Sequence, residues 1–486
     1  MSYEIIADYN MSFILPPNLE DWIPENHPAR FIRLFVEQLD LSELGFREHA
    51  GNTGRAYYSN DIKLKIWLYG YFHKIRSLRG LEVACCNQIG MIWLIGMHHP
   101  DHSTIGNFFN DNKQAIVKLF KESTRLARKA GLIGLVLHAL DGTKLKADVC
   151  DSKGWRLKDI EGSLDALDNR IDEIVDEIES SIKEEEAQAS YHLPDDYKER
   201  VQKELKKSLD ELKIKQKVRE ELDKSRQELE SIDRKHLHPV DKDARMTKSG
   251  FSFNGQAVSD EKSGLIVAQD VVNDEADNDL LVPMIEEVGE TIGETAEETV
   301  ADAGYYSPKQ LLDAEEKELD ILVNINESIA PKKNKKKFHK SNFTYDEEND
   351  VFKCPLGKKL GFTGTGKSRC GKYEERIYRC KSFENCLERE DCSKDKHGRK
   401  VALGPHYQAL LRQLKKQEIP QKKKELFKRK SIIEKVFGFI KEILGFRRFT
   451  VRGLEKVKVQ WSLICTTYNL RKLFKVWTEG KLIIGG

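Results

Sequence analysis

The sequence lacks an uninterrupted apolar run long enough to span a bilayer, so we expect no membrane partner. Its first residues, MSYEIIADYN, have no basic region, apolar stretch or cleavage site, so we expect no signal peptide. It also lacks a large net charge: the formal value is +1, and no global field indicates a nucleic-acid partner. Nine cysteines, several within a lysine-rich region, suit a reducing cytosol better than a secreted disulfide scaffold.

The sequence contains enough apolar residues for a large hydrophobic core. Hydrophobic residues make up 39% of the 486 positions and charged residues 33%, which predicts a soluble protein of about two to four domains. The charges are uneven, because residues 331–345 and 412–430 are strongly basic whereas residues 273–300 contain no Lys or Arg. This asymmetry fits a chain with one anion-facing side, although solvated loops and helix faces would explain each run as well.

The first 130 residues have apolar side chains at helical spacing. Three runs show it, at residues 61–75, 78–96 and 103–133. Short helices with tight turns permit a helix-turn-helix, and a plain helical bundle is an equal alternative. We expect residues 1–130 to form a helical N-terminal domain.

Two aspartates follow apolar stretches that predict buried strands. Leu132 to Leu140 is a continuous apolar run that ends in Asp141-Gly142-Thr143, and Thr299-Val300-Ala301 is followed by Asp302 and Gly304. An aspartate at such a place usually starts a turn or caps a helix. It can also be a metal ligand at the carboxyl end of a central strand. Two occurrences in one chain favour the metal-ligand interpretation.

Residues 154–235 have the pattern of a coiled-coil hairpin inserted after the first strand. The first heptad seam consists of Leu157, Ile160, Leu164, Leu167, Ile171, Ile174 and Ile178. After a loop with Pro194, a second run carries Val201, Leu205, Leu209, Leu212, Val218, Leu222, Leu229 and Ile232. The seam can pair in cis or in trans, and the hairpin is a dimerisation arm, a clamp on a partner or a rigid structural insertion.

The order of predicted elements from Leu132 onward is strand, strand, strand, helix, strand, helix, strand. This matches the ribonuclease-H-like order, an α/β class with a mixed sheet flanked by helices. We assign this catalytic domain to residues 131–153, 236–335 and 401–476. Its first and fourth strands are neighbours, which would bring Asp141 and Asp302 together. The fold needs a third acid on its final helix, where Glu434 stands, although alone Glu434 would be an ordinary exposed helical residue.

A basic, cysteine-containing insertion occupies residues 336–400. Cys354, Cys380, Cys386 and Cys392 are our choice of ligands for a structural Zn²⁺ ion in a small loop-rich unit. The spacing lacks the C-x-x-C pairs typical of zinc sites, so free thiols are at least as good an interpretation. Its many Lys and Arg side chains could lie along a phosphate backbone.

Two strand-end aspartates and a helix glutamate are what two-metal phosphoryl transfer requires. Two divalent cations about 3.5–4 Å apart need bridging and flanking carboxylates. Three close acids repel one another and stay ionised mainly because metal neutralises them. Hard oxygen ligands select Mg²⁺ or Mn²⁺ over Zn²⁺.

Over nearly its whole length the chain resembles a DDE transposase of a bacterial or archaeal insertion sequence. The resemblance rests on LPPNLEDWIPENHPARFI, SLRGLEVACCNQIGMIWLIGMHHPDHSTIGNFF, HALDGTKLKA, NGQAVSDEKSGLIVAQDVVND, VADAGYYS and IIEKVFGFIKEILGFRRFTVRG. It implies that Asp141, Asp302 and Glu434 are the catalytic acids and hold two Mg²⁺ or Mn²⁺ ions. Tyr305 would pack beside this site or touch DNA, and a core tyrosine is the alternative.

Many relatives carry a signature of Tyr, two residues, Arg, three residues, Glu, six residues and Lys. Glu434 and Lys441 fit its spacing, whereas the Tyr position holds Phe427 and the Arg position holds Lys430. Lys430 keeps the charge but not the bidentate fork of Arg, and Phe427 lacks the hydroxyl. The departures concern auxiliary contacts to DNA more than the metal site. The residues expected to contact DNA are Lys430, Lys441, Arg447 and Arg448.

The resemblance implies a DNA transposase, cytoplasmic and associated with the nucleoid. It would bind the terminal inverted repeats of its element through the N-terminal domain, cut strands with water and join the freed 3′-hydroxyl to target DNA. Its partners would be double-stranded DNA, both transposon ends and target, and a second copy of itself in a synaptic complex. Two alternatives are a non-catalytic DNA-binding protein derived from a transposase and a ribonuclease-H-like nuclease without strand joining.

Overall fold

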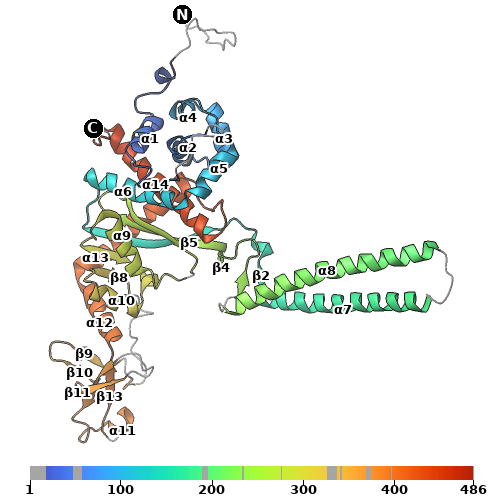
Figure 1. Cartoon of the computed structure of the whole chain (residues 1–486). Coiled ribbons are helices and arrows are strands. Elements are labelled where there is room, and N and C mark those ends of the chain that lie inside the picture. Colours follow the sequence, from blue (N-terminus) through green and yellow to red (C-terminus); the bar gives the residue numbers. More distant parts are fainter. Residues whose placement is uncertain are drawn as a thin grey trace, which may run out of the picture. The chain divides into compact units, whose positions relative to one another are not determined.

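The structure is a computed structural model. It describes residues 18–47, 57–188, 195–231, 235–274, 276–325, 337–339, 342–367, 374–395 and 397–484 (Figure 1). The chain divides into two compact units, the first built from residues 1–143, 254–447 and 455–486 and the second from residues 144–253 and 448–454. None of the described helices combines the length and the apolar character needed to cross a membrane.

The N-terminal part of the first unit is helical, as predicted. Its elements are η1 (Leu19–Trp22), α1 (Pro28–Glu37), α2 (Asn60–Phe72), α3 (Leu78–Asn87), α4 (Ile89–Leu94), α5 (His102–Asp111) and α6 (Lys113–Lys129). The third predicted helical run is broken between α5 and α6 at Asn112. There the Asn112 side chain donates to the carbonyl of Phe108 and accepts the backbone N–H of Arg47, so it competes with the helical ladder.

The central sheet is mixed. Its strands are β1 (Leu137–Lys146), β4 (Arg245–Thr247), β5 (Gly250–Asp260), β6 (Ile266–Val272), β7 (Glu298–Ala301) and β8 (Ile321–Val323). They lie in the order β4-β5-β1-β7-β8, with β6 paired to β5. β5 and β6 are antiparallel, whereas β1, β7 and β8 run parallel to one another. The predicted order and the predicted contact of the first and fourth strands are confirmed, and the sheet is compatible with a ribonuclease-H-like fold.

Helices flank the sheet, and the two that lie between its strands in sequence and the one that carries Glu434 are where the sequence predicted them. The flanking helices are α9 (Leu281–Ile292), α10 (Pro308–Glu316), α12 (Pro405–Glu418), α13 (Pro420–Gly438) and α14 (Leu454–Thr478). α9 packs on β6, while α13 lies against β7 and β8. All four residues of β7 are buried, as expected for a strand covered on both faces.

The first strand begins and ends later than the sequence predicted. The apolar run starts at Leu132, but Gly131 and Leu135 have positive φ angles of 68° and 56°, which strand residues do not adopt. Asp260 accepts the backbone N–H of Leu135 at 3.3 Å and so holds this turn. β1 therefore begins at Leu137 and continues to Lys146, and Asp141 lies within the strand, not at its end.

The second unit contains two long helices, α7 (Leu157–Gln188) and α8 (Asp195–Ser231), which run side by side (Figure 1). Their base is closed by β2 (Trp155–Arg156), which pairs antiparallel with β3 (His236–Leu237). A shared core joins the start of α7 to the end of α8 and consists of Ile160, Leu164, Leu222, Leu229 and Leu237. The seam on α7 is thus covered by α8 of the same chain, and the loop with Pro194 lies outside the described residues.

The cysteine-bearing segment is a sheet with its own core, so the prediction of a loop-rich unit was wrong. Its strands are β9 (Thr344–Asp346), β10 (Val351–Lys353), β11 (Lys359–Lys367), β12 (Glu374–Cys380) and β13 (Lys400–Leu403), and α11 (Arg389–Cys392) lies between the last two. Neighbouring strands are antiparallel, in the order β13-β12-β11-β10-β9. The buried side chains are Phe343, Phe352, Leu360, Tyr378, Val401 and Leu403.

Candidate functional site

Asp141 and Asp302 lie level with each other on adjacent parallel strands. The last register pair of β1 and β7 is Ala139 with Val300, and each aspartate comes two residues later. Side chains two residues apart on a strand share a face, so the side chains of both aspartates lie on the same face of the sheet. The structure thus brings together the two strand aspartates that the sequence singled out.

Asp302 caps the short turn that follows β7. Its Oδ1 accepts the backbone N–H of Gly304 at 2.8 Å, at the start of η3 (Ala303–Tyr305). A β-carbon at position 304 would lie 3.0 Å from the same Oδ1, so glycine here leaves room for the carboxylate. The turn-starting role and the metal-ligand role are therefore compatible, because one hydrogen bond leaves most of the acceptor capacity of the carboxylate unused.

Asp141 forms a buried ion pair that the sequence did not predict. Its Oδ2 lies 2.6 Å from Nη1 of Arg429 on α13, and its Oδ1 accepts the N–H of Gly142 at 2.9 Å. Burial raises the pKa of Asp141, the guanidinium of Arg429 opposes this, and the nearby charge of Asp302 raises the pKa further. The two aspartates are thus close enough for their charges to interact.

Arg429, not Lys430, is the cation of α13 that reaches the aspartates. Arg429 is 8% exposed, whereas Lys430, which holds the arginine position of the signature, is exposed. The helical period could have predicted that Arg429 faces the protein interior. Arg429 stands four and seven residues before Ile433 and Val436, which are buried, so the three side chains lie on one side of the helix. The predicted DNA contact of Lys430 is a different role and stays a prediction.

A third aspartate, Asp277, joins the site from the loop between β6 and α9. Its Oδ1 accepts hydrogen bonds from Nδ2 of Asn254 at 2.6 Å and from Nε2 of Gln256 at 2.7 Å. The hydroxyl of buried Tyr305 donates to Oε1 of the same Gln256. Nothing in the sequence marks Asp277, because it stands among several other acids in the stretch NDEADND.

The pKa of Tyr305 is affected by the acidic side chains around it. It is fully buried, so it is a core tyrosine packed beside the site. Burial raises the pKa of Tyr305, and the charges of Asp277, Asp141 and Asp302 raise it further. Through Gln256, which accepts from Tyr305 and donates to Asp277, the tyrosine is linked to the third aspartate.

Glu434 is exposed on α13. It comes five residues after Arg429, which at about 100° per residue places it about 140° around the helix from the side that reaches Asp141. The buried side of α13 at this point consists of Ile433 and Val436 instead. The helical period thus gives no indication that Glu434 faces the aspartates, and its catalytic role stays a prediction.

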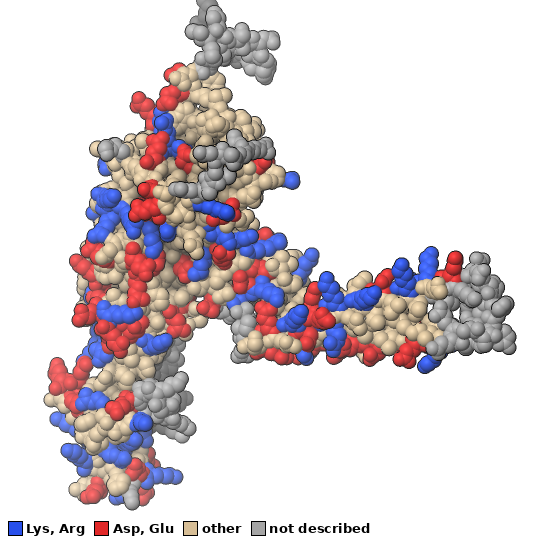
Figure 2. Space-filling model, in the orientation of Figure 1, with Lys and Arg blue, Asp and Glu red and all other residues tan. Residues whose placement is uncertain are grey.

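The four residues predicted to contact DNA lie in different surroundings. Lys441 is in the π-helical turn η5 (Phe439–Ile443), where burial and the nearby charge of Arg447 lower its pKa. Arg447 pairs with Glu442 at 2.5 Å. In the second unit, the exposed Arg448 donates to the carbonyls of Ala147 and Val149. Figure 2 shows basic and acidic side chains intermixed on the face in view, without a single positive field.

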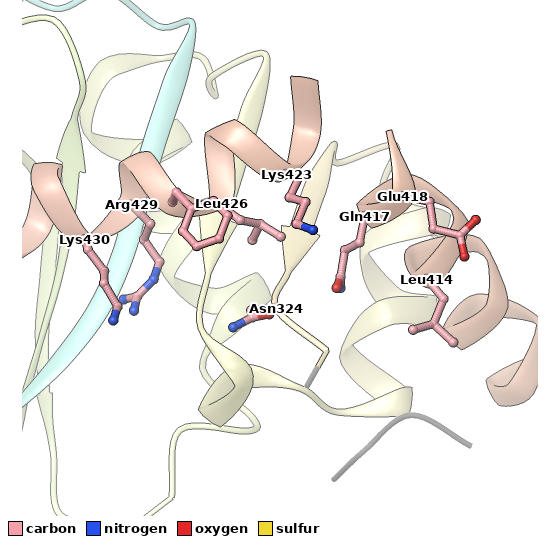
Figure 3. A pocket seen from close by; sticks show the side chains of 9 residues that line it. Asn324, Leu414, Gln417, Glu418, Lys423, Leu426, Arg429 and Lys430 are labelled. Carbon is pink, nitrogen blue, oxygen red and sulfur yellow. The ribbon is translucent and has the colours of Figure 1, made fainter. Parts of the chain in front are cut away.

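A cavity of about 580 Å³ lies beside the Asp141–Arg429 pair. Its lining comes from the end of β8, from α12 and from α13: Asn324, Leu414, Gln417, Glu418, Lys423, Leu426, Phe427, Arg429 and Lys430. Figure 3 shows the side chains of Arg429 and Lys430 extending to the same side of α13. Because Arg429 is paired with Asp141, the cavity has Lys423 and Lys430 against Glu418, a small positive excess suited to an anion such as a DNA phosphate.

The four cysteines chosen as zinc ligands line one small cavity at the edge of the β9–β13 sheet: Cys354, Cys380, Cys386 and Cys392. Burial raises the pKa values of Cys380 and Cys392, and the neighbouring thiols raise them further. Within the described ranges, however, no three or more His, Cys, Asp or Glu side chains are arranged to hold a metal ion. The zinc site therefore stays a prediction, and Cys370 lies outside the described residues.

The oxygen atoms around Asp141 and Asp302 nevertheless suit a divalent cation chemically. Carboxylate and amide oxygens are the ligands that Mg²⁺ and Mn²⁺ prefer. Asn254 is 2% exposed, and its Oδ1 has no hydrogen-bond partner among the residues that the structure describes. A buried acceptor without a donor is costly, and a cation would satisfy it. The donor atoms present are therefore of the chemical kind that the implied metal prefers, while no three of the described acidic side chains are already arranged around one point.

Comparison with known families gives two matches, one in each half of the chain. Residues 17–111 match a transposase domain (DUF772), and residues 353–474 match a transposase DDE domain. The second match includes Glu434, whereas Asp141 and Asp302 lie outside both. No curated protein and no solved structure matches the chain. Both matches confirm the resemblance seen in the sequence and are consistent with a DDE transposase of an insertion sequence.

Proposed function

We propose that the protein is a DNA transposase that binds the terminal inverted repeats of an insertion sequence and performs metal-dependent strand cleavage and strand transfer. The observation that carries the proposal is the level placement of Asp141 and Asp302 on β1 and β7, in a chain with two transposase matches. Adjacent carboxylates on one face of a mixed sheet are what phosphoryl transfer with two divalent cations needs.

Asp141 and Asp302 would hold the two Mg²⁺ or Mn²⁺ ions, with Glu434 as the proposed third carboxylate. When bound, these ions activate the attacking hydroxyl and stabilise the leaving oxygen. Arg429 neutralises Asp141 at 2.6 Å and so helps to keep this buried carboxylate ionised for metal binding. In this structure the charged side chain paired with Asp141 is that of Arg429. The contribution of Glu434 to metal binding therefore needs a test separate from that of the aspartates.

The DNA would meet the protein at two places. The N-terminal helices up to α5, which fall within one transposase match, are part of the proposed binding site for the transposon ends. The positive cavity next to Asp141 would receive a backbone phosphate through Lys423, Arg429 and Lys430. Because two ends must be held together during transposition, we propose a homodimer in a synaptic complex, and DNA binding would associate it with the nucleoid.

Gel assays with end-containing DNA test the proposal. In Mg²⁺ or Mn²⁺ the protein is expected to cut at the ends and to join the freed 3′-hydroxyl to target DNA. Asp141→Asn and Asp302→Asn should bind the ends without cutting them. Asp165→Asn, the same charge change at an exposed position of α7, is the matched control.

Any other outcome of these DNA assays would assign the protein to a different functional class. Cutting without joining indicates a nuclease of the ribonuclease-H-like kind. Binding without either reaction, in wild type as in the variants, indicates a non-catalytic DNA-binding protein derived from a transposase.

A further inference from the structure

Asp277 is held by strand β5 in a way that leaves half of its carboxylate available. Asn254 and Gln256 both donate to Oδ1, at 2.6 Å and 2.7 Å. These two residues lie two apart on β5, so their side chains emerge on the same face of the strand. Two amides on one oxygen fix the orientation of the carboxylate, as supporting residues do around a metal ligand.

The backbone beside each catalytic aspartate leaves space for Asp277. A β-carbon at Gly142, next to Asp141, would lie 3.2 Å from Oδ1 of Asp277. A β-carbon at Gly304, two residues after Asp302, would lie 3.6 Å from Oδ2 of Asp277 and 3.0 Å from Oδ1 of Asp302. Asp277 therefore reaches both backbone segments that carry the aspartates of the proposed site.

A second, independent observation points to a cation at this place. A β-carbon at Gly142 would also lie 2.9 Å from Oδ1 of Asn254, so this amide oxygen faces the same space. Asn254 is 2% exposed, and its Oδ1 has no hydrogen-bond donor among the residues that the structure describes. Buried acceptors are rarely left unsatisfied, and a neutral amide oxygen is a common ligand of hard divalent ions.

We propose that Asp277 is a further metal-binding carboxylate of this site, with Oδ1 of Asn254 as a neutral oxygen ligand beside it. The ion would be Mg²⁺ or Mn²⁺, because every donor is a hard oxygen. This inference rests on the proposed function, since it adds ligands to the site of Asp141 and Asp302. It assigns to β5 and to the loop before α9 a part in holding the metal.

The substitution Asp277→Asn separates this role from a purely structural one. Asparagine keeps an oxygen that can accept both hydrogen bonds from Asn254 and Gln256, but it removes the charge. Mn²⁺ is titrated into the full-length, metal-free protein, and binding is followed by calorimetry. We expect the affinity to fall about tenfold or more, the scale on which groups around a metal matter. Asp279→Asn, an exposed position in the same loop, should change the affinity less than about twofold, the scale of screened surface charges.

Asp141→Asn distinguishes the possible failures. If Asp141→Asn loses Mn²⁺ and Asp277→Asn binds it like wild type, the inference about Asp277 is wrong and the proposed site stands. If wild type binds no Mn²⁺, or if Asp141→Asn binds it unchanged, the proposed site is wrong as well.

A second measurement needs no variant. With Fe²⁺ in place of Mn²⁺, ascorbate and peroxide cut the chain close to the bound iron. Wild type should be cut near Asp141, Asp302 and Asp277 together. Cuts near the first two without one near Asp277 contradict the inference.

Discussion

Arg429 of α13 and Asp141 of β1 form an ion pair of 2.6 Å between residues that lie 288 positions apart in sequence. Their side chains are only 10% and 20% exposed, so water screens the pair little. Arg429 thus balances the charge of a carboxylate that the proposed reaction needs. Any cation that binds Asp141 must share this carboxylate with the guanidinium or displace it.

Arg429→Gln is expected to destabilise the metal-free protein at pH 7 by about 3 kcal/mol, because it leaves a buried carboxylate without its partner. The double variant with Asp141→Asn should be more stable than Arg429→Gln alone. Urea unfolding of the four proteins of this cycle measures the coupling. Equal and additive losses would show that the pair contributes no net coupling.

The pH dependence has a definite sign. The folded-state pKa of Asp141 is raised above its ordinary value of 3.8. At pH values near and above 3.8 the folded state therefore binds more protons at this group than the unfolded state does. The contribution of Asp141 to the free energy of unfolding thus falls as the pH rises through this range. Arg429→Gln raises that pKa further, so its cost should be largest at neutral pH and shrink toward pH 4. Lys428→Gln, which breaks the exposed pair with Glu261 at 2.8 Å, should cost less than about 1 kcal/mol.

The role of Glu434 is tested by Glu434→Gln. We expect it to reduce strand cleavage about a hundredfold or more while end binding stays largely intact, because a lost catalytic charge acts mainly on the transition state. Glu442→Gln, an exposed acid close by in sequence that pairs with Arg447, is the matched control and should cut normally. Near-normal cleavage by Glu434→Gln would remove Glu434 from the site and leave the carboxylates of the strands and loops to hold the metal.

The cysteine cluster is expected to bind one zinc ion per chain. Thiols that raise one another's pKa, as at Cys380 and Cys392, become good ligands when a cation neutralises the thiolates. Cys386→Ser should lose the zinc and loosen the β9–β13 sheet, whereas Cys86→Ser, exposed on α3, should change neither. Metal analysis that finds no zinc in a protein with this sheet folded would contradict the prediction.

The sequence predicted the parts of the site that local patterns determine. Apolar runs marked the strands, and their order placed Asp141 beside Asp302. Asp277 was missed because its loop is acidic throughout, and only the amides of Asn254 and Gln256, which reach it from β5, distinguish it from its neighbours. Arg429 was missed because the helix phase, and not the spacing of the motif, decides which cation faces the sheet.

Other differences also come from tertiary contacts. The turn at Leu135 is held by Asp260, which is distant in sequence, so an apolar run alone could not show where β1 begins. Several strands of the cysteine segment are only three or four residues long, and β10 has one buried side chain between two that are more exposed. Such strands give a weak periodic signal, and their order becomes visible only in the folded sheet.

The hairpin of α7 and α8 is expected to contribute to assembly and not to chemistry. Arg156 and His236 are paired opposite each other at its base, so residues 157–235 can be replaced by an Asn-Gly turn that joins these two strands directly. Because the hairpin has its own core, the rest of the chain should fold without it and bind Mn²⁺ as the intact protein does. Complexes that hold two transposon ends should weaken, as a mobility-shift assay with paired-end DNA would show. A shortened protein that pairs and cuts the ends like the intact one would rule out the assembly role, and one that fails to fold would make the hairpin part of the core.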